Sequence, residues 1–183
     1  MLILNFNPFP NLATQRFILR APALYDDEAF LILRSDPLVN QFLNRPPTTT
    51  AAAARQFIER IQANIAANQS LYWVITTKEN DVPIGTICYW NIVPELDRAE
   101  IGYELQSAFF RKGIMQEVLP VVIQFGFEQL HLQKITAFPA VDNERSVKLL
   151  ERYHFIKDDP LREELEKEED LSAQLCYSLS KPL

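Results

Sequence analysis

Alternation of apolar and polar side chains predicts strands at four places in the N-terminal part of the chain. The first is the short run 16–20, which stops before a proline. The other three are the consecutive runs 71–77, 84–92 and 99–105, and turn-forming residues separate them. Because short turns join antiparallel neighbours, these three runs predict an antiparallel meander.

Apolar residues recur at helical spacing between the first and second predicted strands. Asp26 or Asp27 is the expected N-cap of a helix with Ala29, Phe30 and Leu33 on one face. Three prolines interrupt the chain after that helix. A second amphipathic helix is then expected, beginning with a capping threonine at 48–50 and continuing to about residue 68.

Helices and strands alternate in the rest of the chain. The pattern predicts a helix over 113–130 with Pro120 in its first turns, a strand over 135–138, a helix from an Asn143 cap to Tyr153, and a last strand over 176–179. The order of elements predicts a mixed α+β fold, with a mostly antiparallel sheet flanked by helices.

The composition is that of a single globular domain spanning residues 1–183, with 48% hydrophobic and 23% charged residues. The formal net charge of -6 argues against nucleic acid as a partner and suits a cationic one. Much of the acid lies in 163–170, which is expected to be a solvated helix or loop. The N-terminus lacks a basic flank and contains early prolines, so neither a signal peptide nor a membrane span is expected.

The two cysteines, Cys88 and Cys176, are too few for a disulfide framework and lack the spacing of a zinc site. Their small number favours a cytoplasmic location. Both lie in apolar runs and are expected to be core residues. His131 and His154 have no partner pattern for a triad or a metal, so no metal is predicted.

Two carboxylates lie on one face of the strand 99–105, namely Glu100 and Glu104, with Gly102 between them. Either one is a candidate general base for an ammonium nucleophile, directly or through water. A solvent-exposed polar face is the alternative interpretation.

A second candidate site lies at the start of the helix over 113–130. Arg111 and Lys112 precede Gly113 there, and the free amides and positive dipole end of a helix N-terminus bind anions such as pyrophosphate. The glycine lets the backbone approach a ligand closely. A helix start without a ligand is the alternative.

This segment resembles the acyl-CoA-binding motif of the GNAT acetyltransferase superfamily, in which Gln or Arg is followed by two residues, Gly, one residue, and Gly or Ala. Gly113 matches the central glycine, whereas Phe110 and Met115 depart from the pattern. Further segments are similar to landmarks of the RimJ/RimL-like, ribosomal-protein branch and occur in its order. They are 14–20, 33–37, 84–85, 100–103 and 142–147.

The resemblance implies the GNAT acyl-CoA N-acyltransferase fold, in which two parallel strands splay and open a slot for acetyl-CoA. Contacts with this cosubstrate are then expected at Tyr103, Leu105, Arg111, Lys112, Gly113, Ile114, Met115, Gln116 and Asn143. Ser146 matches a family serine placed to protonate the departing thiolate or relay a proton. The general-acid tyrosine of many members falls on Leu150, and Tyr153 is expected to pack.

The implied reaction is transfer of an acetyl group from acetyl-CoA to a primary amine by direct attack, with a protein N-terminal amine as the first-choice acceptor. The alternatives are a small cationic amine such as a polyamine, an amino acid or an aminoglycoside, and a non-catalytic acyl-CoA sensor. A partner-binding domain without the cosubstrate is the third possibility. A homodimer is compatible with all of them.

Overall fold

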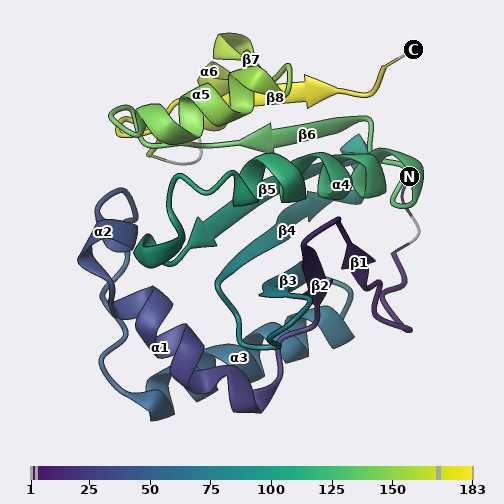
Figure 1. The fold of residues 1–183 in the computed structure, drawn as a ribbon. Coiled ribbons are helices and arrows are strands. Elements are labelled where there is room, and N and C mark those ends of the chain that lie inside the picture. Colours follow the sequence, from purple (N-terminus) through teal and green to yellow (C-terminus); the bar gives the residue numbers. More distant parts are fainter. Residues whose placement is uncertain (1, 3, 168–169, 183) are drawn as a thin grey trace.

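One mixed sheet organises the protein in the computed structural model, which describes residues 2, 4–167 and 170–182 (Figure 1). The eight strands found in this part of the chain are arranged in the order β1-β2-β3-β4-β5-β6-β8-β7. They are β1 (Leu12–Ala13), β2 (Phe17–Arg20), β3 (Leu71–Thr77), β4 (Gly85–Val93), β5 (Arg98–Leu105), β6 (Lys134–Ala137), β7 (Ile156–Lys157) and β8 (Tyr177–Ser180). All neighbouring strands in this order run antiparallel except β5 and β6, which run parallel.

Helices cover both faces of this sheet, with α1 and α3 on one face and α4 and α5 on the other (Figure 1). The helices are α1 (Asp27–Ser35), α2 (Pro37–Asn40), α3 (Ala51–Ala66), α4 (Ile114–Glu128), α5 (Glu144–Arg152) and α6 (Asp159–Leu165). Short 3-10 turns occur at η1 (Leu24–Asp26), η2 (Pro94–Leu96) and η3 (Ser107–Phe109). The arrangement is the predicted α+β class.

Strand alternation divides the core into two clusters. Trp73 and Ile75 of β3 are fully buried in the larger cluster with α4 and α5, whereas Val74 between them packs with Phe30 and Ile58 of α1 and α3. Successive side chains of a strand point to opposite faces, so one sequence run supplies both clusters. A central strand buried on both faces then reads as the continuous apolar run seen here.

The parallel pairing of β5 with β6 stops halfway along β5. Paired residues run from Arg98↔Lys134 to Glu100↔Thr136, but β5 continues to Leu105. Residues 101–105 keep their antiparallel partners in β4 and have no β6 partner within the part of the chain that the structure describes. The sheet is therefore open between the C-terminal half of β5 and the chain that follows β6, which is the predicted splay.

Most predicted elements are confirmed to within two or three residues, with Thr50 as the threonine that caps α3. Asp26 is a correction: its carboxylate does not cap α1 but accepts hydrogen bonds from Arg20 and from the N–H of Ala23. It is 2% exposed, and a buried carboxylate requires such partners. Part of the acidic stretch forms the end of α6, and residues 168–169 lie outside the described residues.

Pro120 lies in the second turn of α4, among the first turns as predicted. A proline has no N–H, so the carbonyl of Gln116, four residues earlier, loses its helical donor. The hydroxyl of Tyr153 donates to that carbonyl instead. Tyr153 therefore has a specific hydrogen-bonding role beyond the packing expected from the sequence.

No helix among the described residues is long and apolar enough to cross a membrane.

Candidate active site

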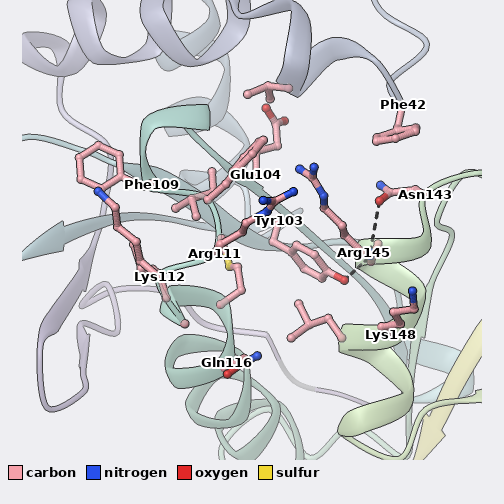
Figure 2. A pocket seen from close by; sticks show the side chains of 18 of the residues that line it. Phe42, Tyr103, Glu104, Phe109, Arg111, Lys112, Gln116, Asn143, Arg145 and Lys148 are labelled. Carbon is pink, nitrogen blue, oxygen red and sulfur yellow. Dashed lines mark hydrogen bonds between the residues drawn. The ribbon is translucent and has the colours of Figure 1, made fainter.

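A cavity of about 420 Å³ lies at the C-terminal end of β5, where the sheet has opened. It is bordered by β5, the turn into α4, the start of α5 and the α2 region (Figure 2). Of the twelve predicted site residues, all but Glu100 line it. These are Tyr103, Glu104, Leu105, Arg111, Lys112, Gly113, Ile114, Met115, Gln116, Asn143 and Ser146.

The turn into α4 has an unusual backbone that explains its glycine. Gly113 is the residue before the helix and has a φ of 71°, and Arg111 also lies in the left-handed region, with a φ of 62°. Left-handed geometry costs a residue with a side chain about 1–2 kcal/mol, but costs glycine little. The two left-handed residues turn the chain so that α4 begins at the cavity with its first amides free of helical partners.

A contact with the N-terminal segment holds the start of α4 in place. Glu117 in the first turn accepts hydrogen bonds from the hydroxyl of Thr14 at 2.6 Å and from the N–H and side chain of Arg16 at 2.8 and 2.6 Å. Burial opposes ionisation, but these donors outweigh it and hold the pKa of Glu117 below its ordinary value. The Arg16 guanidinium also donates to the carbonyl of Lys112. The opening segment 14–20 thus supports the candidate anion site.

Asn143 and Ser146 sit together at the start of α5. The side-chain oxygen of Asn143 accepts a hydrogen bond from the N–H of Ser146, which is the predicted N-cap. The Ser146 hydroxyl is 2.7 Å from the phenol oxygen of Tyr103 on β5 (Figure 2). Burial raises the pKa of Tyr103 to about 12, and the Ser146 contact lowers it only partly. The phenol therefore stays protonated at neutral pH and can donate to Ser146, which leaves the serine proton free to point into the cavity.

The two predicted bases have different surroundings. Glu104 lines the cavity, and both of its oxygens accept hydrogen bonds from Arg45, at 2.6 Å each. Glu100 is outside the cavity lining and accepts a hydrogen bond from the side chain of Asn91. Four residues of strand separate the two by roughly 13 Å, so sharing a face did not bring them to the same site.

Arg45 and the residues of the α2 segment were not named individually among the predicted site residues. The cavity lining also includes apolar residues of α2 and of the chain just after it, two phenylalanines at the end of η3, and one apolar residue and three cations of α5. These are Leu38, Val39, Phe42, Leu43, Phe109, Phe110, Arg145, Lys148, Leu149 and Arg152. Arg145 lies over the ring of Phe110 at 5.3 Å, and Lys112 over that of Phe109 at 4.9 Å. The aromatic pair just before Arg111 is the sequence signal that could have indicated this part of the cavity lining.

Neither cysteine is prepared as a nucleophile. Burial raises the pKa of Cys88 well above its ordinary value, and raises that of Cys176 to about 12. Both thiols are therefore protonated at neutral pH.

His131 and His154 have φ values of 59° and 65° and occupy left-handed positions just after α4 and just after α5. Among the described residues, no group of three or more His, Cys, Asp and Glu side chains could hold a metal ion.

The model of the acetyltransferase (GNAT) domain matches residues 16–156, which include both faces of the cavity. The chain belongs to the GNAT acetyltransferase family. An uncharacterised N-acetyltransferase of Bacillus licheniformis is 36% identical over 152 residues, covering 83% of this chain and 85% of the relative. A second uncharacterised N-acetyltransferase, from Bacillus subtilis, is 31% identical over 174 residues, covering 95% and 98%.

Solved structures with the same fold include ribosomal-protein acetyltransferases. The ribosomal alpha-N-protein acetyltransferase RimL in complex with coenzyme A has a TM-score of 0.78 at 19% identity, with 93% of this GNAT chain and 98% of that chain covered. A ribosomal-protein-alanine acetyltransferase of Vibrio fischeri has a TM-score of 0.70 at 22% identity, with 94% and 100% covered. These likenesses show the GNAT fold.

Proposed function

We propose that this GNAT acetyltransferase transfers an acetyl group from acetyl-CoA to a primary amine, with a protein N-terminal α-amine as the first-choice acceptor. The observation that carries the proposal is the single cavity that joins the open edge of β5, the free start of α4 and the Tyr103–Ser146 pair. The RimL structure, which contains coenzyme A in the same fold, supports the choice of cosubstrate.

The residues present fit acetyl-CoA. Residues 101–105 of β5 offer backbone groups without a β6 partner, which suit the amides of a pantetheine arm. The first amides of α4, together with Arg111 and Lys112, offer donors and positive charge to the pyrophosphate. When bound there, acetyl-CoA would supply an activated thioester. Asn143 would face the arm from the start of α5.

The Tyr103–Ser146 pair is suited to supply the proton that the departing thiolate needs. When Tyr103 donates to the serine oxygen, the serine can donate its own proton towards the cavity. A phenol is protonated at neutral pH, and the raised pKa of Tyr103 keeps it so in basic solution as well. Tyr103 can therefore support Ser146 in a chain whose usual general-acid position is a buried leucine, Leu150.

The acceptor amine must lose a proton before it can attack. An α-amine has a pKa of about 8, whereas a lysine-like alkylamine has one of about 10.4, so a useful fraction of an α-amine is already neutral at physiological pH. Glu104 is the carboxylate in the cavity lining, and Arg45 compensates its charge. We assign Glu104, through water, the remaining proton transfer. A site with this compensated carboxylate suits an α-amine better than a polyamine or an aminoglycoside.

Calorimetric titration with acetyl-CoA, followed by thiol release in the presence of matched amines, tests the proposal. We expect the protein to bind acetyl-CoA. We also expect it to release thiol faster with short peptides that have a free N-terminus than with N-blocked forms of these peptides that carry one lysine. The blocked peptides are the control, because they offer only an ε-amine. Binding without release on any amine would instead favour an acyl-CoA sensor, and absence of binding would remove the proposal.

A further inference from the structure

Four apolar side chains of one short segment line the cavity beside Glu104, namely Leu38, Val39, Phe42 and Leu43. We refer to these residues as the α2 wall. Leu38 is 58% exposed and Leu43 is 38% exposed, and Figure 2 shows Phe42 pointing toward Asn143. Neighbouring exposed apolar side chains on a soluble protein commonly mark a binding surface. Here they form one side of a cavity whose other side carries Tyr103 and Ser146.

The α2 wall is fixed at both ends, to η3 on one side and to β5 on the other. Before it, Asp36 caps α2 and accepts a hydrogen bond from the N–H of Ser107 in η3. After it, Arg45 forms two hydrogen bonds with Glu104 and a third with Asn40 of α2. Both partners of the Arg45–Glu104 pair are less than one-fifth exposed. The wall is thus held in place before any ligand arrives, which lowers the ordering cost of binding.

Even with Arg111 and Lys112 assigned to the pyrophosphate, the remaining charges of the cavity disfavour an acceptor with several positive charges. Glu104 is the one carboxylate among the described lining residues, and Arg45 takes both of its oxygens. The other charged side chains of the lining are all cations: Arg111, Lys112, Arg145, Lys148 and Arg152. Only Lys148 among these five has an ion pair among the described residues, with Glu144 at 2.8 Å. The net charge of -6 is therefore a poor guide to this site, because the cavity itself carries excess positive charge.

We propose that the α2 wall selects an acceptor with a large apolar side chain next to its reacting amine, as in a peptide that begins with Leu, Met or Phe. This inference rests on the proposed function. The amine would reach the thioester beside Glu104, and the adjacent side chain would pack on Phe42 and Leu43. Arg45 is then a positioning residue, since it holds the wall against β5. One extra or missing methylene in an apolar pocket changes kcat/KM by roughly 10- to 200-fold.

Peptides that differ only in their first residue provide the test, with leucinamide and serinamide added to separate peptide recognition from recognition of a free amine. We expect kcat/KM, measured by thiol release, to be at least roughly tenfold higher for Leu, Met or Phe than for Ser, Asp or Lys in first position. Phe42→Ala should bring this ratio close to one while the KM for acetyl-CoA stays the same. Ile156→Ala, an exposed residue of β7 outside the lining, is the matched control and should keep the ratio.

A variant that adds a charge to the α2 wall should reverse the preference for the first residue of the peptide. Phe42→Glu adds a carboxylate to the wall and should favour peptides beginning with Lys over those beginning with Leu. Equal rates for apolar and polar first residues in the native protein would overturn the inference but leave the acetyltransferase proposal intact. A Phe42→Ala variant that slows all peptides by the same factor would also overturn it. Acetyl-CoA binding with no thiol release on any amine would remove the proposed function, and this inference with it.

Discussion

The phenol oxygen of Tyr103 and the hydroxyl oxygen of Ser146 lie 2.7 Å apart and connect β5 with the first turn of α5. One residue comes from the open strand and the other from the helix that Asn143 caps. The pair therefore exists only when both borders of the cavity are correctly placed. Its geometry couples the proposed proton donor to the proposed binding site for the pantetheine arm.

Removal of the serine hydroxyl should slow the chemical step. We expect Ser146→Ala to lower kcat by about 100-fold, which is the low end for a general acid, because a thiolate is already a fair leaving group. Tyr103→Phe should cost about tenfold, since it removes one hydrogen bond and leaves the serine in place. Single-turnover measurements with acetyl-CoA separate these effects from binding. Unchanged kcat in both variants would exclude the pair from proton transfer.

The native pH profile gives an independent check on Tyr103. Its raised pKa, about 12, means that the phenol loses its proton two units above the ordinary value. We expect kcat to rise as the acceptor amine becomes neutral and then to remain level past pH 10. A fall in kcat centred near 10, absent from Tyr103→Phe, would show that the phenol titrates normally and would contradict the assignment.

Glu104 and Glu100 form a matched pair for testing the base, because they lie on the same face of the same strand. We expect Glu104→Gln to reduce kcat/KM for the amine by roughly tenfold or more, with acetyl-CoA affinity retained, because it removes the carboxylate of the cavity. Glu100→Gln should have a small effect, since Glu100 is outside the lining. Steady-state kinetics at several pH values check this. The reverse order of effects would assign the base to Glu100.

The start of α4 should determine affinity for the cosubstrate. Lys112→Ala and Arg111→Ala should each weaken acetyl-CoA binding, and the difference from the native protein should shrink as salt screens the phosphate contacts. Gly113→Ala has room for its methyl group, whose nearest neighbours would be 3.8 Å away, but its φ of 71° is strained for alanine. It should therefore destabilise the fold by about 1–2 kcal/mol. Calorimetry and urea unfolding measure the two effects separately.

Glu117 should contribute stability that depends on pH. Its folded pKa lies below the ordinary value, so its contribution is complete above the unfolded pKa and disappears as the pH falls through the folded pKa. Glu117→Gln should therefore lose about 1–2 kcal/mol of unfolding free energy at pH 7, with a smaller difference below pH 4. Urea unfolding at both pH values tests this. Glu144→Gln, on an exposed pair, is the control and should leave stability little changed.

Much of the fold could be predicted because its signals are local. Strand 71–77 and the helix cap at Asn143 follow from alternation and from capping chemistry within a few residues. Asp26 shows the limit of this reasoning, because its partner Arg20 is brought close by the turn after β2 and competes successfully with the cap. Short elements such as α2 and β7 carry too few residues for a periodic signal.

The donor half of the candidate site could also be predicted, since 110–116 and 143–146 are contiguous segments that resemble family landmarks. The individual residues of the acceptor half could not. Arg45 lies 59 residues from Glu104 in the sequence, and only the folded chain shows that they pair. Likewise, strand alternation places Glu100 and Glu104 on one face but does not say which end of the strand borders the opening.

Because the pairing of β5 is interrupted, hydrogen exchange at the amides of this strand should report whether a ligand is bound beside it. Along residues 101–105, amides that point to β4 are hydrogen-bonded, whereas those that point away face the opening. The second set should exchange with deuterium oxide within the dead time of the free protein and slow down once a ligand adds its own carbonyls to the edge. Alternate residues of one strand should therefore respond differently to the same ligand. Mass spectra of overlapping fragments from 98–105 would record that alternation without any catalytic turnover.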